Sequence, residues 1–333
     1  MTETIGGDHL LNPAFSAEAG TSVNKQNEKK NSVGKQIWKY RERYLMLIPM
    51  LLLVLIFSYL PMYGITLAFK KYRMIDGIFG SPWVGFLQFQ KLFNTASFWT
   101  VMKNTVEISL LRIIFGFPAP IIFALLLNEI RHRKYQRVVQ TVSYLPHFMS
   151  WVVLSGIFMQ LFSTSGVINA VVRLFGGDNV MFMTSQVWFR PILVMTGIWQ
   201  GVGWSSVIYL ASIAGIDPQI YEAARIDGAN RLHMIWYITI PCIYPVISML
   251  FILTIGGILN AGFDQIFNMY NPMVYDVADI LDTYVYRRGF GADGASADYS
   301  FSTAVGLFKN VIGFCLVILS NFVSKKLTDS GIW

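Results

Sequence analysis

Residues 215–230, with the sequence GIDPQIYEAARIDGAN, form a polar island between two strongly apolar runs. Asp217 can cap the N-terminus of a helix, and Gly228 can end that helix in the left-handed conformation. Asn230 can cap a second short helix, which is expected to end before Pro241, where the next apolar run begins. The island therefore predicts a helix, a sharp turn and a second helix, all outside a lipid bilayer.

The rest of the chain has the composition of a membrane protein. Of its 333 residues, 54% are hydrophobic and 14% are charged, and the mean hydropathy is +0.49. A soluble domain has about 25% charged residues. The net charge of +7 could indicate nucleic-acid binding, but excess Lys and Arg in a membrane protein gathers in the cytoplasmic loops. The two cysteines, Cys242 and Cys315, lie in or beside apolar runs, so neither a disulfide framework nor a metal site is expected.

Six apolar stretches are each close to the roughly 20 residues that cross a bilayer as a helix. They are residues 45–69, 106–127, 139–162, 192–213, 241–260 and 303–323. Prolines within them are expected to kink or unwind the helices, and these are Pro49, Pro61, Pro118, Pro120, Pro146 and Pro245. The sequence thus predicts an all-α, polytopic membrane protein with six transmembrane helices.

The distribution of basic residues predicts the orientation. With both termini in the cytoplasm, the cytoplasmic segments hold fifteen Lys and Arg residues and the external loops hold nine. This agrees with the excess of positive charge on the cytoplasmic side of membrane proteins. Lys70, Lys71 and Arg73 conflict locally, because they follow the first span on the outside, but the N-terminal basic cluster is larger.

This orientation predicts three regions. Residues 1–43 are expected to be a disordered, basic cytoplasmic arm, residues 44–324 the transmembrane domain, and residues 325–333 a short cytoplasmic tail. Within the domain, residues 215–240 are placed in the cytoplasm and residues 261–302 form the longest external loop.

The polar island also resembles a known motif. The order of the residues Glu222-Ala223-Ala224, Asp227-Gly228-Ala229, Pro241 and Pro245 is similar to that of the cytoplasmic EAA loop in permease subunits of maltose-type, binding-protein-dependent ABC importers. Ile235 and Ile240 depart from the usual Phe and Leu of this family, and both changes stay apolar.

A second similarity narrows the family. Residues 262–287 and the C-terminal Gly331-Ile332-Trp333 resemble the oligosaccharide and polysaccharide permease branch, with alginate-type transporters among the candidates. The resemblance covers residues 44–333 and implies a type I ABC importer permease fold of the MetI-like class, with a cytoplasmic coupling-helix loop.

The resemblance implies which residues couple the chain to an ATPase. They are Tyr221, Glu222, Ala223, Ala224, Asp227, Gly228, Ala229 and Pro241. As an alternative, Glu222 can pair with Arg225 three residues later on the same helix. The implied partners are a second homologous permease in a heterodimer, two ATP-binding subunits, an extracytoplasmic solute-binding protein and an oligosaccharide. The implied location is the bacterial cytoplasmic membrane.

The chain contains no phosphate-cradling P-loop motif. We therefore expect it to be no enzyme and to hold no cofactor, with ATP and Mg²⁺ bound by the partner ATPase.

Two basic residues are expected within the membrane. Arg112 and Lys309 fall inside apolar stretches, where a charge costs roughly 2.5–3.5 kcal/mol and usually faces a cavity. They can alternatively snorkel to the interface or pair with a carboxylate such as Glu107. If both face a cavity, an anionic sugar such as a uronate oligomer would be a suitable substrate.

The fourth apolar stretch offers groups that suit a sugar. Gln200 and Trp204 lie four residues apart on one helical face, and an amide beside an aromatic ring suits the hydroxyls and CH faces of a sugar. Helix packing is the alternative, since Gly197 and Gly201 form a small-residue pair in the same stretch. Asn260, at the end of the fifth stretch, completes the predicted pathway residues.

The external loop at 261–302 has a net charge of minus four and many aromatic and amide side chains. It is predicted to dock the binding protein, and the residues selected are Gln265, Asn268, Asn271 and Tyr275. A solvated loop with tyrosines at the membrane interface is the alternative.

The predicted function is that of the transmembrane subunit of an ATP-driven importer, which forms half of the pathway for an oligosaccharide or polysaccharide, with acidic ones included. The main alternative is a gradient-driven secondary transporter or channel. It would need buried Asp, Glu or His relays, and apart from Glu107 the spans contain almost none. A membrane enzyme for lipid-linked sugars is disfavoured, because acid–base and metal-binding motifs are absent from the sequence.

Overall fold

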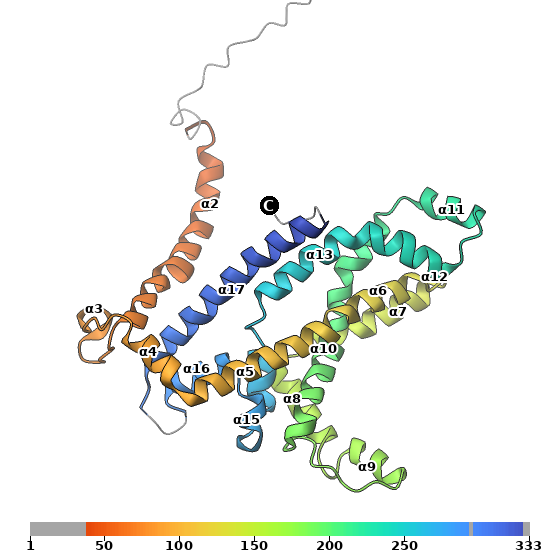
Figure 1. The fold of residues 1–333 in the computed structure, drawn as a ribbon. Coiled ribbons are helices and arrows are strands. Elements are labelled where there is room, and N and C mark those ends of the chain that lie inside the picture. The colour runs from red at the N-terminus through yellow and green to blue at the C-terminus, as the bar shows by residue number, and fades with distance from the viewer. Residues whose placement is uncertain (1–37, 293–295, 329–333) are drawn as a thin grey trace, which may run out of the picture. The chain divides into compact units, whose positions relative to one another are not determined.

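The computed structural model describes residues 38–292 and 296–328, and within these ranges it is built from helices, with one isolated β-bridge and no strands (Figure 1). Most of the predicted arm at 1–43 therefore lies outside the described residues, as do residues 329–333 of the predicted tail. The chain divides into two units between Met62 and Tyr63, and each is described by itself.

The first unit carries a long apolar helix. It comprises α2 (Arg41–Val54), the π-helical turn η1 (Leu55–Tyr59) and the start of η2 (Leu60–Phe69). The helix begins at Arg41, inside the predicted arm, and Pro49 lies within α2 without ending it. After Arg43 its side chains are mainly apolar on all sides, as in a helix surrounded by lipid.

The second unit holds the remaining helices. They are α3 (Gly77–Gly80), α4 (Leu87–Asn94), α5 (Ala96–Leu111), η3 (Arg112–Gly116), α6 (Pro118–Asn128), α7 (Arg133–Tyr144), η4 (Leu145–Phe148), α8 (Trp151–Leu161), α9 (Val167–Leu174), α10 (Gln186–Ala214), α11 (Pro218–Ile226), α12 (Arg231–Met234), η5 (Ile235–Thr239), α13 (Ile240–Gly256), α14 (Phe263–Met269), η6 (Pro272–Val274), α15 (Tyr275–Ala278), α16 (Leu281–Phe290) and α17 (Tyr299–Thr328). Figure 1 shows α11 and α12 at the opposite end of this unit from α15 and α16.

Five of the six predicted spans are matched by single long helices, and the sixth is not a single helix. Five helices are long and apolar enough to cross a membrane, and a sixth span arises if one bent pair is counted. This pair, Arg133–Phe148 and Trp151–Leu161, is bent by 102°, so the predicted span at 139–162 is not a single helix. Pro146 lies in the short η4, and Ser150 caps the restarted helix by accepting from the amide of Val153 at 3.4 Å.

The last helix, α17, continues through residue 324 to Thr328, so the predicted boundary at residue 324 lies within a helix. The place where the membrane domain ends stays a prediction.

The core shows that the segment from α14 to α16 is part of the folded bundle. One buried apolar cluster contains Ile108 of α5, Leu154 of α8, Leu193 of α10 and Ile266 of α14. Since α14 belongs to the predicted external loop at 261–302, the part of this loop from α14 to α16 is a packed layer of short helices.

Polar contacts hold the same layer in place. Arg190 of α10 donates to the carbonyl oxygen of Val277 at 2.9 Å. It also contacts α5, where it donates to the amide oxygen of Asn104 at 2.8 Å and pairs with Glu107 at 2.5 Å. The amide nitrogen of Asn104 in turn donates to the carbonyl oxygen of Asp276 at 2.9 Å. Glu107 is thus paired with Arg190 and belongs to the contacts that hold this layer.

Gly203 allows a close approach between two helices of the bundle. Gly203 of α10 lies so near the carbonyl group of Ser143 in α7 that an added Cβ would overlap it. Gly201, two residues earlier, has open space at the same position. The glycine that packs against α7 is therefore Gly203. Of the pair that the sequence indicated, Gly197 packs against Gln265, where an added Cβ would lie 3.3 Å from Oε1, and Gly201 does not pack.

We expect Gly203→Ala to destabilise the folded protein by about 1–3 kcal/mol, because the added methyl group would push α7 and α10 apart. Gly201→Ala is the matched control and should be neutral or slightly stabilising, since alanine favours a helix over glycine. Thermal unfolding of both purified variants in detergent checks this. Equal melting temperatures would contradict the proposed close contact.

Candidate functional site

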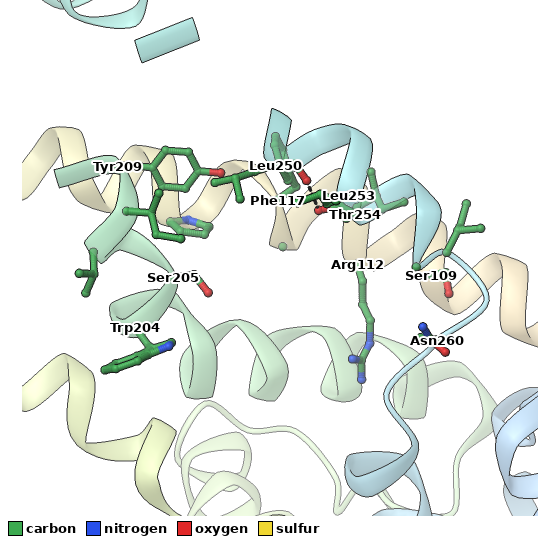
Figure 2. Close-up of a pocket in the computed structure, with 17 residues that line it drawn as sticks. Ser109, Arg112, Phe117, Trp204, Ser205, Tyr209, Leu250, Leu253, Thr254 and Asn260 are labelled. Atoms are coloured by element: carbon green, nitrogen blue, oxygen red, sulfur yellow. Dashed lines mark hydrogen bonds between the residues drawn. The ribbon is translucent and has the colours of Figure 1, made fainter. Parts of the chain in front are cut away.

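A cavity of about 750 Å³ is lined by residues of α5, η3, α6, α10 and α13 (Figure 2). Its volume is in the range of small-molecule sites. The wall is mainly apolar, and its polar side chains include those of Ser109, Arg112, Ser205, Thr254 and Asn260. A smaller hollow of about 240 Å³ shares Arg112, Gly116, Pro120 and Ser205 with it.

Arg112 is the charged residue of this site. It begins the π-helical turn η3, a distortion that often marks a functional position in a helix. Its Nη2 donates to Oε1 of Gln265, and among the described atoms its buried Nε has no hydrogen-bond partner. In the part of the chain that the structure describes, neither cavity is lined by Asp or Glu. The positive charge of Arg112 is therefore not neutralised within this wall.

Four of the five predicted pathway residues come together around these cavities. Arg112, Trp204 and Asn260 line the larger cavity, and Gln200 lines the smaller one beside Arg112. In Figure 2 the side chain of Asn260 lies at the end of the cavity where Arg112 lies, and Trp204 lies toward the other end.

His147 contacts the residues at the aromatic end of the cavity, a role that the sequence analysis did not indicate. Its ring stacks on that of Trp204 at a centroid distance of 4.9 Å and an interplanar angle of 4°. Its carbonyl oxygen accepts from Nε2 of Gln200 at 3.5 Å. One segment, the bend between α7 and α8, therefore orients both predicted sugar contacts.

The fifth residue, Lys309, lies elsewhere, which corrects the prediction. Its Nζ pairs with Asp282 of α16 at 2.5 Å, and it lines neither cavity. The carboxylate that the sequence left open as a partner is thus Asp282 and not Glu107. The pair joins α16 to α17 and has a structural role.

Gln265 also differs from its prediction as a docking residue. Its side chain is 1% exposed, and Nε2 donates at 2.8 Å to both the carbonyl oxygen of Leu193 and Oγ1 of Thr196. A side chain enclosed in this way cannot contact a docked protein. The alternation of buried and exposed residues along α14 turns Gln265 inward, toward Arg112.

The other docking candidates remain partly exposed. Asn268 donates to the carbonyl oxygen of Asp264 at 2.7 Å, and Asn271 donates to that of Met183 at 2.9 Å. The ring of Tyr275 lies 4.4 Å from the guanidinium of Arg287. These contacts stabilise the segment locally, and docking by these three residues stays a prediction.

A second candidate site is the hairpin formed by α11 and α12, and its local structure confirms the sequence analysis. Asp217 accepts from the amide of Gln219 at 3.0 Å, and Asn230 accepts from that of His233 at 2.8 Å. Gly228 turns the chain with a φ of 79°. No side chain of the described helix α11 is buried, so the helix presents its length to the surroundings.

The second helix of the hairpin is longer than expected. It does not end before Pro241, because α12 continues through the π-helical turn η5 into α13, and the helix from Arg231 to Gly256 forms one candidate span. Pro241 lies in the first turn of α13, next to η5, where the irregular turn accommodates the missing amide hydrogen. The hairpin is therefore continuous with a membrane helix.

Two contacts brace the hairpin against the bundle. Tyr221 of α11 shares a hydrogen bond of 2.9 Å with Thr239, and Arg231 of α12 pairs with Glu129, at the end of α6, at 3.2 Å. A hollow of about 920 Å³ lies between these contacts, lined by Glu222 and Arg225 among others. Within the described residues no ion pair joins Glu222 to Arg225, so the alternative role for Glu222 is not observed.

The predicted coupling residues divide by exposure. Glu222, Ala223, Asp227, Gly228 and Pro241 are exposed. Tyr221, Ala224 and Ala229 are half-buried. Among the residues described, no three His, Cys, Asp or Glu side chains cluster to hold a metal ion.

Known proteins resemble this chain over most of its length. Residues 116–329 match the family described as binding-protein-dependent transport system inner membrane component. The chain is 42% identical over 318 residues to the polygalacturonan/rhamnogalacturonan transport system permease protein YteP of Bacillus subtilis (strain 168), covering 95% of this chain and 98% of the relative. It is 45% identical to Protein LplB of the same organism, covering 87% of this chain and 90% of the relative.

Solved structures agree with these relatives. The chain matches one chain of a bacterial alginate ABC transporter in complex with an alginate pentasaccharide-bound periplasmic protein, with a TM-score of 0.82 and 39% identity. The match covers 91% of this chain and 100% of that chain. At this identity the similarity extends beyond the fold to the class of protein.

We expect Lys309→Met alone to destabilise the protein by about 1–2 kcal/mol, because it leaves the carboxylate of Asp282 without its charged partner in a mostly buried position. Combining it with Asp282→Leu should restore most of the loss, since neither charge then remains. Thermal unfolding of the two single variants and the double variant forms the required cycle. Additive losses would show that the two residues do not act as a pair.

Proposed function

The chain belongs to the binding-protein-dependent transport system inner membrane component family, and from this premise we propose that it forms half of the membrane pathway for oligosaccharides derived from an acidic polysaccharide. As a member of this family it is a membrane permease and not a catalytic subunit. The proposal therefore concerns its cargo, its partners and the residues that serve them.

The observation that carries the cargo proposal is the charge of the cavity. Arg112 places a guanidinium in a wall where the described lining residues include no carboxylate. A guanidinium binds a carboxylate with charge-assisted hydrogen bonds, and the low polarity of the surroundings strengthens the attraction. Uronate residues carry one carboxylate on each sugar, so a chain of them offers repeated partners to Arg112.

The neutral part of the cavity fits the rest of such a sugar. Trp204 offers an aromatic face for the CH groups of a pyranose ring, and Gln200 and Asn260 offer amides for hydroxyl groups. The names of the relatives support the same class of cargo, because polygalacturonan, rhamnogalacturonan and alginate are all uronate-containing polysaccharides.

In this proposal the hairpin of α11 and α12 docks a cytoplasmic ATPase, which binds ATP and Mg²⁺. Its exposed residues Glu222 and Asp227 offer carboxylates to a partner surface. The braces from Tyr221 to Thr239 and from Arg231 to Glu129 would make the hairpin move as one body with the membrane helices. The chain itself would need no cofactor.

The remaining partners follow from the same family. A second, homologous permease would complete the pathway as a heterodimer, two ATP-binding subunits would engage the pair, and an extracytoplasmic binding protein would deliver the oligosaccharide to the segment from α14 to α16. The protein would lie in the bacterial cytoplasmic membrane with both termini in the cytoplasm, in accord with the distribution of Lys and Arg.

We expect Arg112→Gln to lower kcat/KM for uptake of uronate oligosaccharides by about tenfold to a hundredfold, the worth of a charge-assisted hydrogen bond. The complete importer, with its binding protein, would be tested in proteoliposomes with labelled trigalacturonate. Arg173→Gln is the matched control, since it removes an equal charge from an exposed residue outside both cavities. Unchanged uptake by the Arg112 variant would rule out its contact with the cargo.

We expect Glu222→Lys and Gly228→Pro to abolish transport while leaving membrane insertion intact. The first reverses a charge on the docking surface, and the second cannot adopt the positive φ observed at Gly228. The measurements are uptake, co-purification of the ATPase with each variant, and the stimulation of ATP hydrolysis by the loaded binding protein. Asp178→Lys, a charge reversal on an exposed residue outside the hairpin, is the control. Normal uptake in the hairpin variants would refute the coupling role.

A further inference from the structure

We propose that Gln265 is a positioning residue that gives the pathway its selectivity for anionic sugars, because it holds the guanidinium of Arg112 without cancelling its charge. This inference rests on the proposed function, and it goes beyond it by assigning selectivity to an almost fully buried residue that acts through Arg112. It also replaces the docking role that the sequence indicated for Gln265.

The first argument is that both polar atoms of the Gln265 amide form hydrogen bonds within the protein. Gln265 comes from α14 and is 1% exposed, so its polar atoms have no access to water. Nε2 donates to the carbonyl oxygen of Leu193 and to Oγ1 of Thr196, both at 2.8 Å and both in α10. Oε1 accepts from Nη2 of Arg112. A single side chain thus joins α14, α10 and η3.

The second argument is the confinement of the guanidinium from the other side. Gly262 adopts a φ of 87°, and a Cβ at this position would overlap the guanidinium of Arg112. The backbone at Gly262 and the amide of Gln265 therefore form one seat for Arg112, provided by a segment of only four residues. Figure 2 shows the side chain of Arg112 extending away from its helix, at the end of the cavity where Asn260 lies.

The third argument is chemical. An arginine in a weakly polar wall needs hydrogen-bond acceptors, and Asp or Glu would be the usual ones. A carboxylate at position 265 would neutralise Arg112, and it could not donate to the carbonyl oxygen of Leu193. Glutamine is the side chain of this length that both accepts from Arg112 and donates to α10. Since the backbone of Gly262 and the amide of Gln265 are neutral, the charge of Arg112 in this seat stays positive. The guanidinium can therefore attract an anion.

The consequence is that selectivity depends on the segment from Gly262 to Gln265 as much as on the cavity wall. A neutral acceptor leaves the attraction of Arg112 for a carboxylate intact, whereas a charged one would remove it. A side chain without an acceptor would leave the charge but free the guanidinium to reorient, which lowers affinity through lost preorganisation.

The test uses the complete importer in proteoliposomes, with the binding protein saturated by either trigalacturonate or its methyl ester. The measured quantity is the ratio of the two kcat/KM values, so that a general loss of activity cancels. For Gln265→Glu we expect the preference for trigalacturonate to fall about tenfold to a hundredfold. For Gln265→Met we expect a smaller fall, because the charge is retained.

A double-mutant cycle separates positioning from a general structural role. If Gln265 acts through Arg112, Gln265→Met should not change the ratio further in the Arg112→Gln background. Equal effects in both backgrounds would show that Gln265 does not act through Arg112 and would overturn the inference. Thr196→Val provides a second route should the Gln265 variants fail to fold, since it removes one anchor of the amide. It should reduce the preference in the wild-type background only.

The outcomes distinguish the two proposals. A wild-type importer without preference for trigalacturonate over its methyl ester contradicts the proposed acidic cargo, and this inference falls with it. A clear wild-type preference that Gln265→Glu and Thr196→Val both leave unchanged overturns only the role of Gln265.

Discussion

The hydrogen bond between Arg112 and Gln265 meets the most demanding constraint in this protein. A guanidinium inside a membrane span is costly unless polar groups surround it, and a helix alone cannot supply them, because its own carbonyl groups are already bonded. The bundle meets this need with an amide from α14, which is itself held by α10. The segment after the fifth span must therefore fold back into the bundle for the site to exist.

That requirement explains why the segment from α14 to α16 is not a loose loop. Ile266 is buried with Ile108, Leu154 and Leu193 in one apolar cluster, and Arg190 bonds the carbonyl oxygen of Val277. The apolar contacts supply most of the stabilisation, and the polar contacts fix the register of the segment on α5 and α10. A partner that pressed on this layer would therefore act close to the seat of Arg112.

The hairpin of α11 and α12 obeys a different constraint. Helix α11 carries no buried residue, yet the hairpin must keep its shape, and it does so through end-capping by Asp217 and Asn230 and through the brace from Tyr221 to Thr239. Its continuity with α13 through η5 gives a direct mechanical connection to the membrane. The cavity and the hairpin share α6, α10 and α13, so a movement of these helices would affect both.

The amino-acid sequence by itself determined the features that depend on neighbouring residues. The apolar stretches gave the spans, and the caps at Asp217 and Asn230 and the turn at Gly228 were read correctly, because these contacts form within a few residues of chain. The helical spacing of Gln200 and Trp204 likewise predicted that they share one face of a helix. In the structure Trp204 lines the larger cavity and Gln200 the smaller one. Only the tertiary structure decided which distant residues meet. It buried Gln265, paired Lys309 with Asp282 and Glu107 with Arg190, bent the third span by 102°, and made Gly203 the close contact with Ser143. Each of these depends on the packing of separate helices, and neither composition nor local periodicity specifies which surfaces come together.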